Sequence, residues 1–486
     1  MKVTSEPRFA VIGAGMSGLL CGVKLKDAGI TDFAIYEKAD RVGGTWRENT
    51  YPGLACDVPS HLYRYTFAPN PEWSHRFSPG AEIQAYFEKT AADFDLEPFI
   101  RYGKEIIRCE FSDGRWTLES ADGLLDTVDF VICATGVLHH PNEPQIVGLE
   151  TFAGACFHSA RWDHDVPLDG QRVGIIGTGS TAVQITGAIV DRVAQLALFQ
   201  RTAQWIFPQD NPVYSETEKQ SFRERPDDLR ELYQFLSKAF SESFSSAVVG
   251  ANPEQLALIE DACRHNLEDS VRDPALLRKL TPDYQAACKR LIVSDNFYQA
   301  IQKPNAELVV EGIAAVEPGG VRCADGSFHE LDVLVLATGF HPHQFMRPMA
   351  VIGRDGVALD DAWSESTRAY RSVSIPGFPN FFMLIGPNSP IGNFSLIEVA
   401  ELQFDYIMQL IEQVRSGQCR EIAATADATR TFNDELADAM GGTVWVTGCR
   451  SWYLDDNGIP ATWPWTFDRF QQEMRAPDLD HFECVA

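Results

Sequence analysis

Two glycine-rich segments constrain the fold of this chain more than any other feature of its sequence. The first, Gly13–Gly18, reads GAGMSG, and the second, Gly177–Ala182, reads GTGSTA. Each follows a short apolar run and opens a segment with helical periodicity. In such a strand–loop–helix unit, the first glycine makes a tight turn, the second lets a pyrophosphate approach, and the third position lets helix and strand pack closely. Since the helix N-terminus then faces the phosphates, the sequence predicts two dinucleotide-binding units.

The rest of the chain alternates buried strands with helices, which predicts a doubly wound α/β fold. Short apolar runs predict parallel strands at Phe9–Ile12, Phe33–Tyr36, Val128–Ala134, Arg172–Ile176, Leu196–Gln200, Leu331–Ala337 and Phe381–Ile385. Helical patterns cover Ser17–Ala28, Ala81–Phe94 and Thr181–Val193. Residues 214–284 are charged, helical in period and free of strand patterns, so we expect a helical insertion in the second unit.

An acidic residue and two segments of small residues favour FAD in the first unit. Glu37 ends the strand after the first glycine loop, 22 residues beyond Gly15, where a carboxylate accepts a ribose hydroxyl. Residues 41–46 (RVGGTW) and 129–136 (DFVICATG) place small side chains where a flavin would continue beyond its pyrophosphate. A tight turn without a ligand is the alternative for the glycine loop alone. The predicted FAD-binding residues are Gly13, Gly15, Ser17, Gly18, Glu37, Lys38, Gly44, Thr45, Trp46, Ala134, Thr135 and Gly136.

An arginine replaces the acidic residue in the second unit. Arg201 follows the strand after the second glycine loop, and a guanidinium can bind a 2′-phosphate that a carboxylate would repel. We therefore expect NADP here, and an ordinary surface arginine at a strand end is the alternative. A second Ala-Thr-Gly segment closes the unit. Its predicted NADP-binding residues are Gly177, Gly179, Ser180, Thr181, Arg201, Thr202, Ala337, Thr338 and Gly339.

Composition argues against several other classes of function. The chain has 41 basic and 68 acidic residues, a net charge of −27 at pH 7, and such a surface repels nucleic acid and anionic lipid. No apolar run approaches the roughly 20 residues that span a bilayer, so we expect no membrane insertion. The 11 cysteines are dispersed without a CxxC or CxxH spacing, which argues against a metal site or a redox-active dithiol. Such cysteines are typical of reduced thiols in a cytosol, so we expect a cytoplasmic protein.

Two longer motifs narrow the class of flavoprotein. The pattern FxGxxxHxxxW followed by Pro or Asp matches at each fixed position, namely Phe152, Gly154, His158, Trp162 and Asp163. A second pattern, GGxW with an aromatic-Pro-Gly and an aspartate, matches at residues 43–46, 51–53 and Asp57. With these motifs the chain resembles the class B flavoprotein monooxygenases, and within them the Baeyer–Villiger monooxygenases of the phenylacetone, cyclohexanone and hydroxyacetophenone group. The resemblance runs from about Arg8 to Phe470.

The first motif has a more modest interpretation when its residues are considered alone. Residues 152–163 lie between the two nucleotide units, so they are interpreted as an interdomain linker. A lone histidine in a linker is more often structural than catalytic. The resemblance implies that His158 is a hinge element that couples the domains, without acting as an acid or base.

The resemblance also implies the catalytic residues. Arg290 would sit over the flavin in contact with Asp57, and Lys289 would help to hold the 2′-phosphate. A fixed guanidinium can stabilise a peroxyanion and the negative charge of its ketone adduct, whereas an ordinary Asp–Arg ion pair is the alternative. Trp452 would contact NADP. The substrate pocket would be bordered by Ile391, Gly392, Asn393 and Phe394.

The activity that the resemblance implies depends on FAD, NADPH and O2. One oxygen atom would be inserted next to a ketone carbonyl through a C4a-peroxyflavin, giving an ester or lactone. One alternative is an oxygenase of sulfides or amines with the same fold, and another is an NADPH-dependent flavin reductase or redox sensor. The partners would be a small-molecule ketone, with sulfide as a further possibility, and O2, and the protein would be a monomer or homodimer.

Domain boundaries follow from the order of these features. We expect an FAD-binding domain of residues 1–140 and 341–486, in which the chain returns after the second Ala-Thr-Gly. Residues 141–213 and 285–340 would form the NADP-binding domain. Residues 214–284 would be the helical insertion within it.

Overall fold

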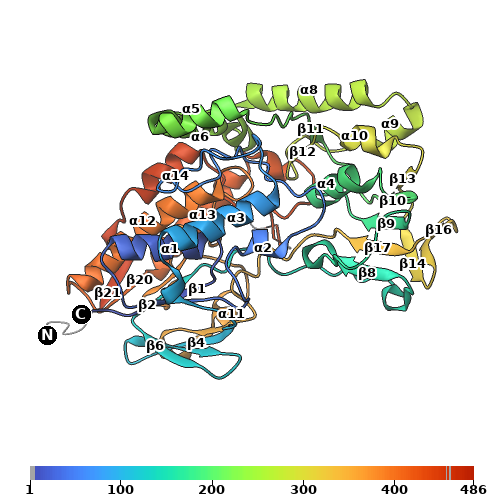
Figure 1. Cartoon of the computed structure of the whole chain (residues 1–486). Coiled ribbons are helices and arrows are strands. Elements are labelled where there is room, and N and C mark those ends of the chain that lie inside the picture. The colour runs from blue at the N-terminus through green and yellow to red at the C-terminus, as the bar shows by residue number, and fades with distance from the viewer. Residues whose placement is uncertain (1–5, 456, 459–460, 486) are drawn as a thin grey trace.

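Two five-stranded parallel sheets form the framework, with the strand orders β19-β7-β1-β2-β3 and β13-β10-β9-β17-β8 (Figure 1). The computed structural model describes residues 6–455, 457–458 and 461–485. The first sheet comprises β1 (Phe9–Ile12), β2 (Phe33–Tyr36), β3 (Ile100–Arg101), β7 (Phe130–Cys133) and β19 (Phe381–Met383). The second comprises β8 (Ala155–His158), β9 (Arg172–Ile176), β10 (Gln195–Phe199), β13 (Ala306–Val309) and β17 (Val333–Leu336). The predicted α/β fold with two dinucleotide-binding units is therefore confirmed.

The central strands form because their side chains are apolar on both faces. Each residue of β1, β2, β7 and β17 is buried, which is typical of a parallel sheet covered on both sides. In the first sheet Phe9 pairs with Phe33 on one side and Phe130 on the other, and its ring stacks on that of Phe130 at 4.7 Å. The seven predicted strands all occur, three with the predicted bounds and four with ends that differ by at most two residues.

Helices cover both sheets. The helix after the first glycine loop, α1 (Met16–Asp27), packs against α3 (Gly80–Asp93) and α12 (Leu396–Arg415). The helix after the second loop, α4 (Ser180–Ile189), packs against α10 (Phe297–Ile301). Among the described residues, no helix is long and apolar enough to cross a membrane.

Several smaller strands lie outside the predicted set. In two of them, β4 (Ile106–Ser112) and β5 (Arg115–Ser120), buried residues alternate with more exposed ones, as expected for antiparallel strands with one face towards solvent. One sheet joins β18 (Ala350–Ile352), β4 (Ile106–Ser112), β5 (Arg115–Ser120) and β6 (Leu125–Val128), and another joins β14 (Ile313–Glu317), β15 (Gly320–Cys323) and β16 (Phe328–Glu330). The pairs are β11 (Ile206–Phe207) with β12 (Ile292–Val293), and β20 (Glu421–Ala424) with β21 (Phe482–Val485).

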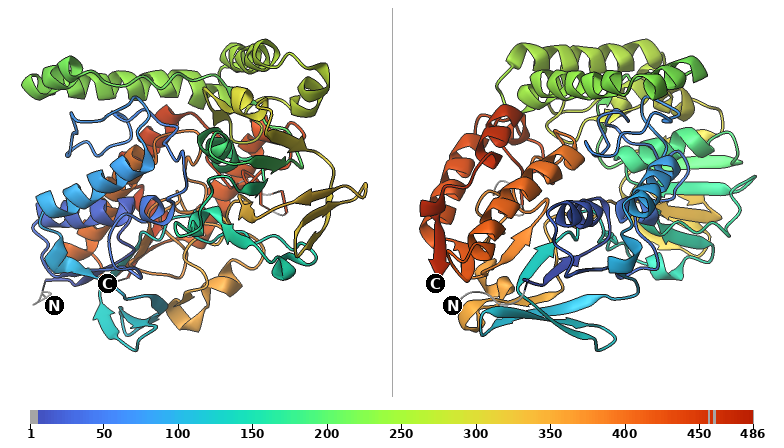
Figure 2. Two further views of the ribbon diagram at one scale, coloured as in Figure 1. Left: turned by 45° about the vertical axis from the view of Figure 1, so that its right-hand side comes forward. Right: turned by 60° about the vertical axis from the view of Figure 1, so that its left-hand side comes forward.

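The expected helical insertion forms a layer across the top of both sheet units (Figures 1 and 2). Residues 214–284 contain helices and no strand. On the first unit, Ser237 of the insertion donates a hydrogen bond of 3.1 Å to the buried Glu398 on α12. Burial raises the pKa of Glu398 to about 7. The insertion consists of α5 (Glu216–Glu224), α6 (Pro226–Phe240), a π-helical turn (Ser241–Ser245), α7 (Ser246–Val248), α8 (Pro253–Ser270) and α9 (Pro274–Leu280).

The two chain segments that connect the sheet units run side by side. Asn142 donates its backbone N–H to the carbonyl of Gly339 at 2.8 Å, and His341 donates to the carbonyl of His140 at 2.9 Å. Pro141 and Phe340 form a β-bridge between them. The chain therefore passes between the two sheet units at this pairing.

Candidate functional site

The two glycine loops line one cavity of about 1680 Å³. This volume exceeds the roughly 300–1,000 Å³ of a pocket for one small ligand, so the cavity has room for more than one. Basic side chains outnumber acidic ones in its lining, although the whole chain carries 41 basic and 68 acidic residues. A local excess of positive charge is what anionic nucleotides require.

Most of the predicted site residues line this cavity, although they are dispersed along the sequence. Around the first loop the lining includes Gly13, Gly15, Ser17, Glu37, Lys38, Gly44, Thr45, Trp46, Asp57, Ala134, Thr135 and Gly136. Around the second loop it includes Gly177, Gly179, Ser180, Thr181, Arg201, Thr202, Lys289, Arg290, Ala337, Thr338 and Gly339. From the C-terminal part it includes Ile391, Gly392, Phe394 and Trp452. The lining leaves out Gly18, Asn393 and the five residues of the first family motif.

In the first loop, each of the three glycines is required for a different structural reason. Gly13 has φ of 103°, and a Cβ there would lie 2.6 Å from the carbonyl oxygen of Ala134. A Cβ on Gly18 would lie 1.8 Å from the carbonyl oxygen of Gly13, so this glycine permits close packing of helix and strand. A Cβ on Gly15 would meet only Gly44, at 3.4 Å. Gly15 is therefore the position that is open on its cavity side, as a pyrophosphate site requires.

The second loop repeats this geometry. Gly177 has φ of 120°, and a Cβ there would lie 2.3 Å from the carbonyl oxygen of Ala337. A Cβ on Gly179 would meet no atom within 4 Å. The third position is Ala182, which is fully buried. Both loops thus leave their second glycine open towards the cavity.

The helices that follow the two loops have no side-chain cap. The N-caps of α1 and α4 are Gly15 and Gly179, and neither helix receives a capping side-chain hydrogen bond. The first-turn N–H groups therefore remain available to phosphate oxygens. Other helices in the chain are capped by Ser215, Asn252, Thr425 and Thr466. The open glycines and uncapped helix ends fit the pyrophosphates of FAD and NADP.

Glu37 anchors the first loop and faces the cavity. Its carboxylate accepts hydrogen bonds from the backbone N–H groups of Ala14 and Ala39, both at 2.9 Å, and forms an ion pair with Arg47 at 3.0 Å. A carboxylate has about four acceptor positions, so one remains for a ribose hydroxyl. Glu37 therefore stabilises the loop and can also accept a hydrogen bond from the predicted ribose.

Two cations lie together at the end of the second sheet. The positive charge of Arg201 and burial both lower the pKa of Lys289, with burial the larger cause. The ammonium of Lys289 lies 4.6 Å from the centre of the Tyr284 ring, and Tyr284 donates a 3.0 Å hydrogen bond to the carbonyl of Ala203. In the described part of the chain neither Arg201 nor Lys289 forms an ion pair with a carboxylate. Unpaired cations held in proximity fit the 2′-phosphate of NADP.

Replacing Arg201 with alanine should raise the KM for NADPH by roughly 10- to 100-fold, since a charge-assisted contact contributes about 1.5–3 kcal/mol. The KM for NADH should change little, because NADH has no 2′-phosphate. Lys289→Ala should act in the same direction with a smaller effect. Steady-state kinetics with both coenzymes measure the change, and Arg192→Ala, an exposed arginine paired with Asp169, is the matched control. Wild-type NADPH kinetics in both variants would overturn the 2′-phosphate assignment.

Arg290 and Asp57 form an ion pair on the cavity wall. The charge of Asp57 is the largest cause that raises the pKa of Arg290 above its ordinary value. About a third of the Arg290 side chain, 34%, is exposed, so the guanidinium has surface left beyond its partner. The structure therefore provides a fixed positive charge that a developing oxyanion could contact.

Tyr453 is a neighbour of Arg290 that sequence reasoning did not assign. A Cβ on Gly392 would lie 2.5 Å from the phenol oxygen of Tyr453 and 3.2 Å from a guanidinium nitrogen of Arg290. Burial raises the pKa of Tyr453 to about 12, so the phenol stays protonated. Its position directly after Trp452, which the resemblance assigns to NADP contact, was the available signal. Gly392 is thus confined by both side chains.

The second family motif packs against the helix of the other unit. Tyr51 donates a hydrogen bond of 3.0 Å to the side chain of Gln184 on α4, and Gln184 donates one of 3.0 Å to the carbonyl of Ala55. Gly53 has φ of 81°, and a Cβ there would lie 2.6 Å from the carbonyl oxygen of Gln184. The motif therefore holds the loop that carries Asp57 against the second glycine-loop unit.

The cavity also has an apolar wall, and part of it comes from the insertion. Phe240 and Phe244, at the π-helical turn, line the cavity together with Phe394. The rings of Phe240 and Phe394 meet edge to face at 5.7 Å. Asn393 is 1% exposed and lies outside the lining, whereas its sequence neighbours Gly392 and Phe394 line the cavity.

The first family motif belongs to the second sheet, so its interpretation as a linker is wrong in part. Residues Ala155–His158 form β8, an edge strand that pairs in parallel with β17. His158 accepts from the backbone N–H of Ala160 at 3.1 Å through Nδ1, which leaves Nε2 to donate to the carbonyl of Gly339 at 3.0 Å. Burial lowers the pKa of His158, so the ring stays neutral. The histidine therefore fastens the end of β8 to the segment that returns to the first unit.

The expectation that the cysteines are all reduced thiols is wrong for two of them. Cys288 and Cys449 form a disulfide with a Cα–Cα distance of 6.2 Å. They are 161 residues apart, and no sequence spacing indicates this pair. Among the described residues, no group of three or more His, Cys, Asp or Glu side chains could hold a metal ion.

Comparison with known proteins identifies the family. The pyridine nucleotide-disulphide oxidoreductase family matches residues 10–228. A Baeyer–Villiger monooxygenase of Streptomyces coelicolor is 41% identical over 492 residues, which cover 100% of this chain and 94% of the relative. This chain belongs to the Baeyer–Villiger monooxygenase family. The resemblance inferred from the two motifs is therefore confirmed.

Other relatives agree with this membership. An uncharacterised monooxygenase of Mycobacterium tuberculosis is 51% identical over 94% of this chain and 92% of its own length. The structure of cyclohexanone monooxygenase from Rhodococcus sp. Phi1 bound to NADP+ matches with a TM-score of 0.87, 26% identity and 99% coverage of both chains. An oxidised steroid monooxygenase bound to NADP matches with a TM-score of 0.87 and 28% identity, over 99% of this chain and 100% of that one. The Baeyer–Villiger fold thus extends over nearly the whole chain.

Proposed function

We propose that this protein is an NADPH- and O2-dependent FAD monooxygenase that inserts one oxygen atom beside a ketone carbonyl to give an ester or lactone. The observation that carries the proposal is the Arg290–Asp57 ion pair, which faces the same cavity as both glycine loops. Membership of the Baeyer–Villiger family supports it. NADP bound to the structurally similar cyclohexanone and steroid monooxygenases supports the second nucleotide.

FAD, when bound and reduced by NADPH, supplies the activation of O2. The first loop and Glu37 would hold its pyrophosphate and ribose, and the second loop with Arg201 and Lys289 would hold NADPH. Helix α12 begins at the cavity, and Ser395 provides no side-chain cap, so its first-turn N–H groups can stabilise negative charge on the reduced flavin.

Arg290 would act on charge that develops during oxygen transfer. Its guanidinium can stabilise both a nucleophilic oxygen anion and the oxyanion formed from the ketone carbonyl. Asp57 would orient the guanidinium without neutralising all of its donors, because Arg carries five N–H groups. The apolar side chains of Phe240, Phe244 and Phe394 would bind the hydrocarbon part of the substrate and exclude water.

The expected substrate is a small apolar ketone, with sulfide oxidation as a side activity. This preference rests on the fixed positive charge beside an aromatic wall, since a nucleophilic oxygen anion attacks carbonyl carbon. We further propose a monomer or homodimer in the cytoplasm. Disulfides are rare in a reducing cytosol, so the redox state of the Cys288–Cys449 pair bears on the proposed location.

Oxygen-isotope labelling tests the proposal. The purified, FAD-loaded protein is incubated with NADPH, a cyclic ketone and isotopically labelled O2, and products are analysed by mass spectrometry. One labelled oxygen atom in an ester or lactone, with one NADPH consumed, is the expected result. Labelled sulfoxide from a sulfide, without ester from any ketone, would favour the oxygenase of soft nucleophiles. Hydrogen peroxide with no labelled organic product would favour a flavin reductase.

A further inference from the structure

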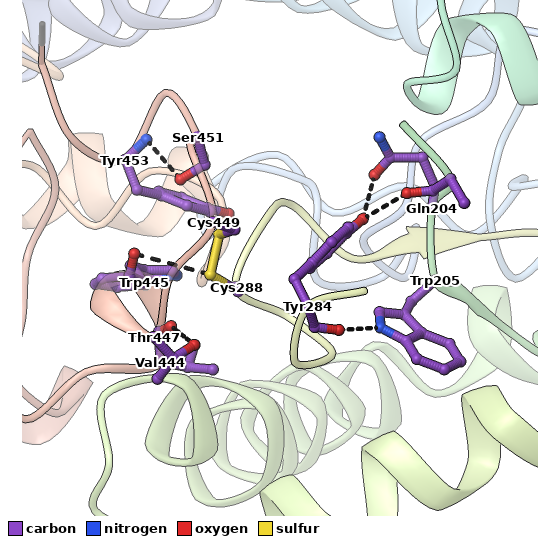
Figure 3. Close-up of a disulfide and its surroundings, with 11 residues drawn as sticks. Gln204, Trp205, Tyr284, Cys288, Val444, Trp445, Thr447, Cys449, Ser451 and Tyr453 are labelled. Carbon is purple, nitrogen blue, oxygen red and sulfur yellow. Dashed lines mark hydrogen bonds between the residues drawn. A yellow bond between two sulfur atoms is a disulfide. The ribbon is translucent and has the colours of Figure 1, made fainter. Parts of the chain in front are cut away.

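The disulfide joins two segments that both contribute to the proposed active site (Figure 3). Cys288 directly precedes Lys289 and Arg290, and Cys449 directly precedes the residues 450–452 that line the cavity. The segments approach from opposite parts of the chain and come from the two nucleotide units. The cross-link therefore lies one residue away from functional groups on either side.

A small apolar core surrounds the disulfide and joins three parts of the molecule. It contains Val248 and Val249 from the insertion, Ala287 from the Arg290 segment, and Trp445 and Tyr453 from the C-terminal segment. The ring of Tyr453 stacks on that of Trp445 at 4.8 Å. Since Tyr453 also lies beside Arg290, a shift of the C-terminal segment would change the surroundings of the guanidinium.

The site accommodates both the disulfide and the two thiols. The Cys288 sulfur lies 3.8 Å from the carbonyl oxygen of Trp445, which is an acceptor for a thiol proton once the bond is reduced (Figure 3). Cys288 is fully buried, whereas Cys449 is partly exposed to solvent. Cys449 is therefore the sulfur that a soluble oxidant or reductant can reach, and Cys288 is placed to respond to it.

We propose that Cys288 and Cys449 are a reversible thiol-oxidation site, in which the disulfide fixes the C-terminal segment against Arg290 and strengthens NADP binding. The oxidant class is a hydroperoxide, and the source that we infer, peroxide released by uncoupled turnover, rests on the proposed function. Peroxide from uncoupled turnover would thus form the cross-link that strengthens NADP binding. The reductant class is a soluble dithiol.

The chemistry balances in two steps. The Cys449 thiol loses its proton, its sulfur attacks one oxygen of hydrogen peroxide, and the O–O bond breaks. Hydroxide leaves and takes up that proton as water, while a sulfenic acid forms. The Cys288 thiol then loses its proton, its sulfur attacks the Cys449 sulfur, and the S–O bond breaks as the S–S bond forms. The second hydroxide leaves and takes up the Cys288 proton as water. The two sulfurs together lose two electrons, which the peroxide gains. In reverse, one thiol of a dithiol attacks the accessible Cys449 sulfur, which releases Cys288 as a thiol and forms a mixed disulfide. The second thiol of the reductant then attacks the reductant's own sulfur, which releases Cys449 as a thiol and leaves the reductant as a disulfide.

Mass spectrometry and coenzyme binding test the proposal independently of oxygenation. The FAD-loaded enzyme is treated with dithiothreitol or hydrogen peroxide, free thiols are alkylated, and peptides are analysed without reduction. The peptides that contain Cys288 and Cys449 should be linked after peroxide and separate after dithiothreitol. The dissociation constant for NADP+ should rise by about fivefold or more on reduction, the lower end of typical couplings between sites.

Two variants assign the effect to this pair. Cys449→Ser should bind NADP+ like the reduced enzyme and respond to neither reagent. Cys484→Ser is the matched control, because Cys484 is an exposed cysteine that lies beside a second thiol, Cys419. This control should switch like the wild type.

The outcomes separate the inference from the proposed function. No linked peptide after peroxide would overturn the site, and a linked peptide with unchanged NADP+ affinity would overturn the switch. If Cys449→Ser fails to fold, reduced and oxidised wild-type protein give the same comparison. If NADP+ binding depends on the redox state but the protein oxygenates no ketone, the redox site is supported and the proposed reaction is wrong.

Discussion

Replacing Arg290 with alanine should lower the rate of ketone oxygenation by at least about 100-fold, while FAD stays bound and NADPH still reduces it. Removing one preorganised oxyanion donor costs roughly 2.7–4 kcal/mol. Among the described residues, the Arg290 side chain forms its hydrogen bond with Asp57 and none with either glycine loop. Both nucleotide sites should therefore keep their structure in the variant. NADPH consumption should persist with hydrogen peroxide as its product, because activated oxygen is no longer held for transfer. Product chromatography, NADPH absorbance and a peroxide assay measure the three quantities.

Three further variants show whether the loss arises from the guanidinium itself. Arg290→Lys should restore only part of the activity, since a point charge cannot reproduce the planar fork that pairs with Asp57. Asp57→Ala should show a milder defect, with the arginine present but no longer oriented. Arg108→Ala, which removes an exposed arginine paired with Glu110, is the control and should oxygenate normally. Normal rate and coupling in Arg290→Ala would make the proposed mechanism untenable.

The sequence predicted the nucleotide loops well because their requirements are local. The tight turn, the open face and the close packing each require glycine at one position, namely Gly13, Gly15 and Gly18. The strands flanking them are continuous apolar runs, which only a sheet covered on both faces buries. The motif residues Tyr51 and Gly53 were found as a pattern, but their contact with Gln184 required the packed structure.

The remaining features depend on contacts between distant parts of the chain. Phe240 and Phe244 lie in a helical insertion whose apolar face gives no indication of the cavity that it covers. The Cys288–Cys449 disulfide spans 161 residues, and no spacing rule pairs cysteines so far apart. Residues 155–158 are interpreted as part of a linker from their place between the two units, and a four-residue edge strand has too little periodicity to indicate otherwise.

Valine at Gly15 should give a folded protein that purifies without FAD. Gly15 has φ of −78°, which any residue adopts, and its Cβ would meet only Gly44 at 3.4 Å. The side chain would instead occupy the approach of the pyrophosphate. Loss of two charge-assisted contacts of about 1.5–3 kcal/mol each corresponds to roughly 10²- to 10⁴-fold weaker binding. Visible absorbance of the purified protein measures the flavin, and circular dichroism measures the fold.

Valine at Gly179 should give the reciprocal result, a yellow protein that NADPH no longer reduces. Gly179 has φ of −72°, and a Cβ there meets no protein atom within 4 Å, so the fold has no reason to suffer. Gly18→Val separates ligand loss from misfolding, because its Cβ would lie 1.8 Å from the carbonyl oxygen of Gly13 and should prevent folding. Each loop variant is thus a control for the other. Flavin loss in Gly179→Val with flavin kept in Gly15→Val would reverse the assignment of the two cofactors to their loops, since each variant adds only a side chain in the approach of one ligand.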